Sequence, residues 1–425
     1  MLRNLRPDLF QSSLSRPYAN SSPSPHTSPE KVSVYDYFCL CLYGNNKTAI
    51  LANIIVTGLV GLISVDLLYA WYRNVCNERL LNETVENGTR PEAGVSSDKF
   101  ISRPEIVERL KRIFQPYEDQ SYYYMVCGEH GTGKTTLTRT ASSEVGHGVI
   151  YVDVPANFNE LGEAFGKAIN FTFEERISFT RQLIRKILDQ PKTSEWERAL
   201  KAFKRASAVY KAKNGKPPVI VYDNISRLVY KNPEILDILQ DDAKDNADDR
   251  KYIAVFVSSE GSVPRRMELM EIGDLSKEES MEYLTKKRKI NEVEAKNLYE
   301  LVGSRIIELK TVADDFVAGQ SFEVIRQQIL TKVEKKFDYA KLLPDQALHE
   351  AGKHVIGALI DSKEIHTSVF RKFIGDEKFG EVLGANVFAY HPSRDTVTFQ
   401  SQSIEYYIQE NASIFGNTQE GKRKM

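Results

Sequence analysis

The sequence predicts an α/β fold in which a parallel sheet is flanked by helices, followed by mainly helical segments with one small hairpin. Three observations lead to this prediction. Short apolar runs of strand length alternate with helical patterns between residues 99 and 275. A glycine-rich loop lies between the first of these runs and the helix that follows it. Helical patterns then precede two short strand-like runs near the C-terminus.

The glycine-rich loop matches the pattern G-x-x-x-x-G-K-[ST] at every fixed position. Its residues, with the threonine after it, are Gly128, Glu129, His130, Gly131, Thr132, Gly133, Lys134, Thr135 and Thr136. Such glycines let backbone N–H groups turn toward phosphates, and the next helix adds the positive end of its dipole. Lys134 supplies a cation to the β- and γ-phosphates, and Thr135 offers a hydroxyl to Mg²⁺. The loop therefore predicts a site for ATP and Mg²⁺.

A second nucleotide motif lies in the apolar run of residues 219–223, which ends in Asp223. In a phosphate-loop fold, an aspartate at the end of a buried strand contacts Mg²⁺ or its bound water. The distance from the loop is that of one half of a doubly wound sheet. Thr135 and Asp223 are therefore the predicted metal ligands.

The next apolar run, residues 252–257, ends in Ser258 and Ser259. Ser259 either senses the γ-phosphate at the tip of this strand, or the two serines only cap the following turn. Arg265 lies in the next loop, where it acts as an arginine finger on a neighbouring subunit's nucleotide or is an ordinary solvated arginine.

Residues 276–279 form a capping-box pattern that opens a helix. The two short runs 386–390 and 396–399 read as a hairpin after helices, which is the order of a winged helix. Their basic residues are scattered, which favours packing on the nucleotide domain over DNA binding. The whole chain of 425 residues has a formal net charge of −1 and does not require a nucleic-acid partner.

Near the N-terminus, residues 48–72 form an apolar stretch long enough to cross a bilayer, which needs about 20 mainly apolar residues. Tyr69, Trp71 and Tyr72 fit a membrane interface at one end, and Asp66 lies close to it. A buried core helix is the alternative, disfavoured because polar segments flank the stretch on both sides. The sequence predicts a single-pass membrane protein.

The segment before this stretch is rich in serine, proline and arginine. This composition fits either a mitochondrial transit peptide or an ordinary disordered tail. If it is a transit peptide, the mitochondrial inner membrane is the expected location.

We predict seven segments along the chain. They are an N-terminal tail (1–47), a transmembrane helix (48–72), a polar linker (73–98), a nucleotide-binding domain (99–275), a helical lid (276–337), a winged-helix-like domain (338–411) and a C-terminal tail (412–425).

The order of these parts resembles the AAA+/STAND group of P-loop NTPases, in particular its archaeal-type ATPase branch. The resemblance spans residues 99–411 and rests on the loop, on the strand ends at Asp223 and Ser259, and on Gly303-Ser304-Arg305 in the lid. It implies that Arg305 is a sensor-2-like residue and that the C-terminal module transmits the nucleotide state. A membrane helix before such a domain also resembles fungal mitochondrial inner-membrane P-loop proteins.

One position departs from that group, in which a glutamate follows the Mg²⁺-site aspartate. Here Asn224 follows Asp223, and an amide can orient water but cannot accept its proton. ATP hydrolysis is therefore expected to be slow, or to use another acid such as Asp153 or Glu260. The candidate catalytic residues are Lys134, Asp223, Asn224, Ser259, Arg265 and Arg305.

The first functional hypothesis is a membrane-anchored ATP-binding protein, a slow ATPase that acts as a nucleotide-dependent switch with a protein partner or as a homo-oligomer. One alternative is a membrane-tethered interaction scaffold whose nucleotide is structural. Another is a membrane-associated ATPase that binds nucleic acid.

Overall fold

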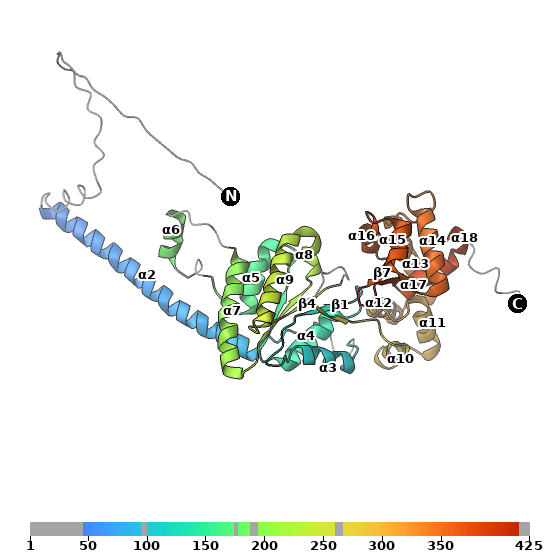
Figure 1. Cartoon of the computed structure of the whole chain (residues 1–425), viewed down its shortest axis with the longest axis horizontal. Coiled ribbons are helices and arrows are strands. Elements are labelled where there is room, and N and C mark those ends of the chain that lie inside the picture. Colours follow the sequence, from blue (N-terminus) through green and yellow to red (C-terminus); the bar gives the residue numbers. More distant parts are fainter. Residues whose placement is uncertain (1–45, 95–99, 174–176, 188–193, 260–266, 416–425) are drawn as a thin grey trace, which may run out of the picture. The chain divides into compact units, whose positions relative to one another are not determined.

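A computed structural model describes residues 46–94, 100–173, 177–187, 194–259 and 267–415 (Figure 1). The chain divides into two compact units, residues 1–65 and 66–425. The predicted tail up to residue 45 lies outside the described residues, as do Glu260 and Arg265.

Among the described residues, five parallel strands form a sheet in the order β2-β3-β4-β1-β5. Their bounds are β1 (Tyr124–Cys127), β2 (Val149–Asp153), β3 (Val219–Asp223), β4 (Ile253–Val257) and β5 (Glu268–Glu271). Each strand lies in or overlaps one of the apolar runs of the sequence. The register pairs Asp153 with Asp223, so the acids that end β2 and β3 lie side by side. The predicted α/β fold is confirmed.

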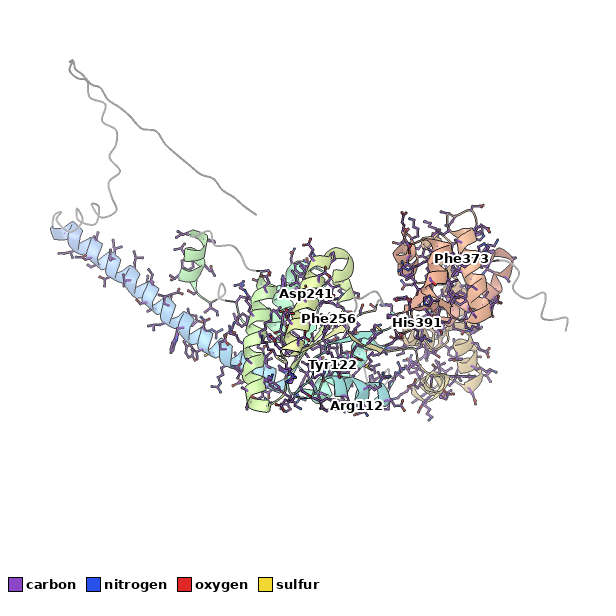
Figure 2. The ribbon with its side chains drawn as sticks, viewed as in Figure 1. Arg112, Tyr122, Asp241, Phe256, Phe373 and His391 are labelled. Atoms are coloured by element: carbon purple, nitrogen blue, oxygen red, sulfur yellow. The ribbon has the colours of Figure 1, made fainter. Side chains whose placement is uncertain are left out.

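Helices cover both faces of the sheet. They are α3 (Pro104–Ile113), α4 (Lys134–Val145), η1 (Phe158–Glu160), α5 (Leu161–Ala168), α7 (Glu195–Asn214), α8 (Ser226–Lys231) and α9 (Pro233–Asp248). A further short helix, α6 (Phe179–Ile187), precedes α7 in the chain. Because side chains alternate along a strand, Ile220 and Tyr222 pack in one apolar cluster with α5 and α7. Val219 and Val221 pack in another with α3 and α4. Phe256 of β4, labelled in Figure 2, belongs to the first cluster.

The apolar N-terminal stretch belongs to one helix of 42 residues, α2 (Asn46–Asn87). Among the described residues, its part from Ile50 to Asn87 is long and apolar enough to cross a membrane. The helix continues well beyond residue 72, where a polar linker was expected. Leu81 and Val85, four residues apart on one face, are fully buried in the cluster with α5 and α7. This end of α2 is therefore part of the nucleotide-binding domain.

Polar contacts hold the same end of α2 in place. The Asn77 amide donates to the carbonyl of Thr172 and accepts from its N–H, both at 2.8 Å. After the helix, the Thr89 N–H donates to Val149 O at 3.0 Å, and its hydroxyl accepts from the N–H of Tyr151 at 3.1 Å. Up to this point the expected linker is ordered structure beside β2.

The C-terminal part is mainly helical. Its elements are α10 (Lys277–Glu282), η3 (Tyr283–Lys287), α11 (Glu292–Val302), α12 (Ile306–Val317), α13 (Phe322–Tyr339), α14 (His349–Ser362), β6 (Ile365–His366), α15 (Thr367–Ile374), α16 (Phe379–Gly384), β7 (Phe388–His391), β8 (Thr396–Phe399), α17 (Gln402–Glu410) and α18 (Ala412–Phe415). The predicted capping box is present, with reciprocal hydrogen bonds between Ser276 and Glu279. The predicted hairpin is β7–β8, and with β6 it forms an antiparallel sheet in the order β6-β8-β7.

One apolar core joins the lid helices to the winged-helix-like part. Ile325, Ile329, Val333 and Phe337 form the buried face of α13. The ring of Phe337 lies 5.0 Å from that of Phe415, near the end of the described chain. The expected boundary between residues 337 and 338 thus falls inside a continuous core. We call residues 275–415 the C-terminal body.

Candidate nucleotide-binding site

The glycines of the loop adopt backbone conformations that few other residues tolerate. Gly128, Gly131 and Gly133 have φ values of 147°, 86° and 88°. A Cβ at Gly128 would lie 2.2 Å from the carbonyl oxygen of Ile272, so a side chain has no room there. A Cβ at Gly131 would lie 2.3 Å from Cγ2 of Ile307. The loop is therefore tightly curved, and the first turn of α12 packs directly on it.

Lys134 is the first residue of α4 and is almost fully buried. Its ammonium donates to the carbonyl of Glu129 at 2.6 Å, so the positive charge lies beside the loop backbone. Burial lowers the pKa of Lys134 to about 8, against the opposing attraction of Glu129. The charged form of Lys134 is thus less favoured than that of an ordinary lysine in the ligand-free protein, and an anion at the loop would stabilise it.

The predicted metal ligands lie together. The Thr135 hydroxyl donates to Oδ1 of Asp223 at 3.3 Å, and the Tyr151 hydroxyl donates to Oδ2. Burial raises the pKa of Asp223, and hydrogen bonds from Tyr151, Thr135 and the N–H of Asn224 oppose this effect. Burial and the neighbouring Asp223 also raise the pKa of Tyr151, which keeps its hydroxyl protonated. Tyr151, from β2, was not among the predicted site residues.

Asn224 has a left-handed backbone with φ of 61°, a region that asparagine tolerates better than most residues. Its side-chain amide donates to Asp153 at 2.9 Å. Asp153 also pairs with Arg139 at 2.8 Å and with Arg227 at 3.3 Å. The acid considered as a substitute base is therefore engaged by two guanidinium groups and an amide.

An open cavity of ≈ 180 Å³ connects these groups. It is lined by His130, Gly131, Gly133, Lys134, Thr135, Thr136, Asp223, Asn224, Val257, Ser258 and Ser259. The Ser259 and Ser226 hydroxyl oxygens lie 3.5 Å apart, so Ser259 contacts both the cavity and the start of α8. Ser258 is buried behind it. The cavity brings the loop and both strand ends to one place.

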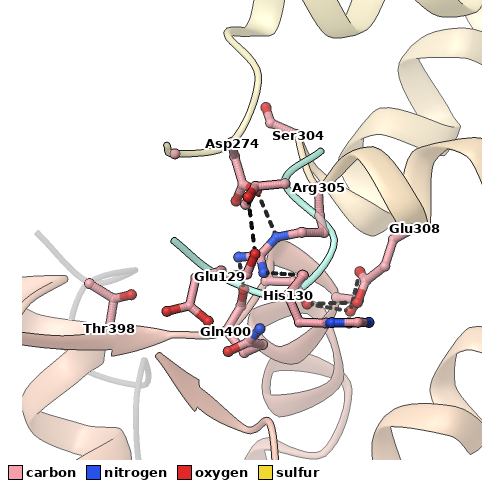
Figure 3. Close-up of polar contacts among 12 residues, drawn as sticks. Glu129, His130, Asp274, Ser304, Arg305, Glu308, Thr398 and Gln400 are labelled. Atoms are coloured by element: carbon pink, nitrogen blue, oxygen red, sulfur yellow. Dashed lines mark hydrogen bonds and ion pairs between the residues drawn. The ribbon is translucent and has the colours of Figure 1, made fainter. Parts of the chain in front are cut away.

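Arg305 lies at the start of α12 and joins the loop to the C-terminal body (Figure 3). Its guanidinium donates to the carbonyl of His130 at 3.0 Å and to the carbonyl of Gln400. It also pairs with Asp274 at 2.7 Å. Beside it, the Ile307 N–H donates to Gly131 O at 3.2 Å. The side chain of Arg305 is buried, and it contacts the loop backbone in this ligand-free state.

Glu129 shares the environment of Arg305 within the loop. Burial raises the pKa of Glu129, while the charges of Arg305 and His391 and a hydrogen bond from Gln400 oppose that effect. In Figure 3 its carboxylate lies on the same side of the loop as Gln400 and Thr398. Glu129 was predicted only as a variable position of the loop pattern, and no spacing rule indicates this contact.

Arg103 is a second buried arginine that the motifs did not indicate. The helix α3 begins after Arg103, with Pro104 in its first turn. The Arg103 guanidinium donates to the carbonyls of Gly273 at 2.8 Å and Asp274 at 3.0 Å. It holds the segment that leads from β5 into the C-terminal body.

A further contact joins the hairpin to β5. His391, labelled in Figure 2, places Nδ1 2.6 Å from Glu271, and the Ser393 hydroxyl donates to the same carboxylate. Burial would raise the pKa of Glu271, but these hydrogen bonds bring it below its ordinary value. The carboxylate is therefore charged near neutral pH and fixes the hairpin to the strand.

The residues present fit a bound nucleotide with Mg²⁺. The curved loop has no room for a side chain at Gly128 or Gly131. Lys134 is the buried cation beside it. Thr135 and Asp223 place two oxygen ligands 3.3 Å apart. Hydroxyl and carboxylate oxygens are the donors that Mg²⁺ prefers, with phosphate oxygens and water filling the other positions.

Residues 118–262 match the family model described as an AAA domain. The chain contains an AAA-type P-loop NTPase domain. The matched segment includes the loop, Asp223 and Ser259, whereas Arg305 lies beyond it. A comparison with curated proteins found no match.

Solved structures similar to this chain include several ATPases. The Walker-type ATPase of Pyrococcus abyssi is 14% identical with a TM-score of 0.48, over 74% of this chain and 97% of that one. Cdc6p of Pyrobaculum aerophilum is 11% identical with a TM-score of 0.38, over 77% and 99%. AMPPCP-bound DnaA of Aquifex aeolicus is 15% identical with a TM-score of 0.33, over 68% and 87%.

Proposed function

We propose that the protein is a membrane-anchored ATP-binding switch with slow ATPase activity. The observation that carries this proposal is the position of Arg305, which binds the loop at His130 O and the C-terminal body at Gln400 O. Occupation of the loop by nucleotide would act on the same backbone that Arg305 holds. The C-terminal body is then the output of the switch, for a protein partner or a second copy of the chain.

In the bound state, Lys134 contacts the β- and γ-phosphates, and the loop N–H groups surround them. Thr135 and Asp223 hold Mg²⁺, which when bound neutralises phosphate charge. To reach the phosphates, the Lys134 ammonium has to leave the Glu129 carbonyl, now 2.6 Å away. Because Glu129 lies in the electrostatic environment of Arg305, this rearrangement acts on the link to the C-terminal body.

Slow turnover follows from the groups around Asn224. Its amide donates to Asp153, so it can hold a water in place but cannot take the water's proton. Arg139 and Arg227 pair with the Asp153 carboxylate, so its oxygens are already engaged by two guanidinium groups. Ser259 and Arg305 are proposed to contact or sense the γ-phosphate. Arg265, which lies outside the described residues, is proposed to act as an arginine finger on a neighbouring subunit's nucleotide.

Membrane anchoring is supported by the composition of α2. Its large apolar residues from Ile50 to Leu68 are exposed, including Leu62 at 69%. An exposed apolar surface of this length is covered in a bilayer by acyl chains. The mitochondrial inner membrane is the proposed location, on the basis of the N-terminal composition alone.

Binding of ATP to the full-length chain in nanodiscs tests the proposal. Lys134→Ala should weaken binding of ATP with Mg²⁺ by at least about tenfold, since a buried charge-assisted contact contributes about 1.5–3 kcal/mol. Isothermal titration or a fluorescent ATP analogue measures the dissociation constant.

Lys167→Ala is the matched control, because it removes an exposed lysine from α5 of the same domain. Its affinity for ATP should equal that of the unmodified chain. Equal affinity in the Lys134→Ala chain would contradict the proposal. Resistance to alkaline extraction is the separate test of the anchor.

A further inference from the structure

Helix α6 exposes an apolar face that no described part of the protein covers. Phe179, Leu183 and Ile187 recur at intervals of four residues and are 73%, 49% and 71% exposed. Residues at this spacing lie on one side of a helix. A nine-residue helix with three large exposed apolar side chains on one face needs an apolar environment.

The start of α6 is fixed to the residue at which the long apolar run of α2 is interrupted. Asp66 accepts hydrogen bonds from the Ser178 hydroxyl at 2.7 Å, the Thr180 N–H at 2.9 Å and the Phe179 N–H at 3.3 Å. Its carboxylate thereby caps the free N–H groups at the start of α6. This pairing explains how an acid is accommodated within an otherwise apolar segment.

The residues just after Asp66 have the composition of a membrane interface. Tyr69, Trp71 and Tyr72 are 53%, 67% and 59% exposed. Exposed tyrosine and tryptophan are enriched at the level of lipid headgroups. Because Asp66 precedes them by less than two helical turns, the start of α6 is bonded to the part of α2 that fits this level.

The charge of α6 is also that of an interfacial helix. Its nine residues contain Arg181, Arg185 and Lys186 and no acid. Amphipathic helices with large apolar residues on one face and arginine or lysine on the polar face lie in the plane of the bilayer interface, and anionic lipids attract their positive charge. A protein partner would explain the apolar face, but it would not explain the bond to Asp66 beside an aromatic belt.

We propose that α6 lies on an anionic lipid bilayer, with Phe179, Leu183 and Ile187 in the boundary between headgroups and acyl chains. This inference rests on the proposed membrane anchoring of α2. It adds a second attachment to the membrane, which begins at Phe179, 113 residues after Asp66 in the sequence. This attachment places the AAA-type domain close to the lipid surface.

The test places an environment-sensitive fluorophore on Leu183→Cys in the full-length chain, with Cys39→Ser, Cys41→Ser and Cys76→Ser. Cys127 is buried and can remain. In nanodiscs that contain phosphatidylserine, the emission should shift to the blue, and lipids with a shallow doxyl group should quench it. The control label is Val293→Cys on α11, whose native side chain is 71% exposed against 49% for Leu183, and it should show neither effect.

Charge reversal by Arg181→Glu with Arg185→Glu should remove most of the shift, as should replacement of phosphatidylserine by phosphatidylcholine. A label that stays in water, or that is shielded equally without anionic lipid, would overturn the inference. Alkaline extraction on the same samples separates the two proposals. If the chain resists extraction but its label remains in water, the membrane anchor is supported and the α6 site is contradicted. If the label is quenched but the chain is extracted, the α6 site is supported and the membrane span is contradicted.

Discussion

At the scale of single residues, the function of Lys134 and its burial have opposite effects on its charge. It must be charged to attract phosphates, yet burial lowers its pKa from 10.5 to about 8. Without ligand, Lys134 therefore binds its proton more tightly in the unfolded chain than in the folded chain. The stability of the folded state accordingly rises with pH between about 8 and 10.5. Nucleotide binding has the opposite dependence, because the phosphates need the protonated lysine.

We predict that the affinity for ATP is constant just below pH 8 and falls above it, by up to about tenfold per pH unit. The reason is that binding above the pKa of Lys134 requires uptake of a proton. Dissociation constants measured from pH 7 to 10 check this. In Lys134→Arg, whose guanidinium stays charged, the affinity should be weaker but independent of pH in that range. The same fall in Lys134→Arg would exclude Lys134 as its origin.

Asn224 gives the second residue-scale prediction. Asn224→Glu supplies the missing base and should raise the rate of ATP hydrolysis. The same change puts a longer side chain at φ of 61° and a carboxylate beside Asp153, which should cost about 1–3 kcal/mol of stability. Turnover assays and chemical denaturation measure the two effects.

Asn224→Gly is the comparison for this experiment, because glycine accepts the same backbone angle without a side chain. It should retain stability to within about 1 kcal/mol and hydrolyse ATP no faster than the unmodified chain. A faster Asn224→Gly chain would show that removal of the amide, and not the added carboxylate, accounts for the gain.

At the scale of elements, the end of α2 is a structural part of the AAA-type domain. Leu81→Ala should lower the free energy of unfolding by about 2–5 kcal/mol, because it leaves a cavity in the cluster with α5 and α7. Leu80→Ala, next to it and 49% exposed, should change stability by less than about 0.5 kcal/mol. Denaturant melts of both chains in detergent decide this, and equal effects would mean that the helix end is not packed in solution.

The elements also show what the sequence could predict. The loop, the strand ending in Asp223, the capping box at Ser276 and the β7–β8 hairpin depend on short-range patterns, and the structure has them all. The segment expected as a polar linker from residue 73 is helical up to Asn87, because its polar residues hide Leu81 and Val85 on one face. Periodicity indicates such a face, but only the fold shows what it packs against.

The same limit applies to the site. Lys134, Thr135 and Asp223 follow from spacing along the chain, and the structure brings them to one cavity. The contact from Tyr151 and the position of Arg103 depend on strand register and on a connection of about 170 residues, as the pairing of Arg103 with Gly273 shows. No local pattern contains that information.

At the scale of the whole molecule, Arg305 is the predicted connection between nucleotide and the C-terminal body. Addition of ATP should change hydrogen exchange in residues 388–410, because binding at the loop acts on the backbone that Arg305 holds. Arg305→Ala should abolish that change and also destabilise the protein, since it leaves Asp274 and two carbonyls without their donor.

The matched variant for this experiment is Arg371→Ala, which removes a half-exposed arginine paired with Asp376. Its exchange response to ATP should be that of the unmodified chain. A response that persists in Arg305→Ala, at a temperature where the variant is folded, would mean that the signal travels by another route.

The continuous core of the C-terminal body has a consequence for any partner that binds it. Because the lid helices and the winged-helix-like part share one packed interior, a partner on any face of the body contacts the same unit that Arg305 holds. Coupling between two binding sites is reciprocal. If ATP increases the affinity of the protein for a partner by some factor, the partner must increase the affinity for ATP by the same factor. A change in nucleotide affinity can therefore serve as the assay that finds the partner.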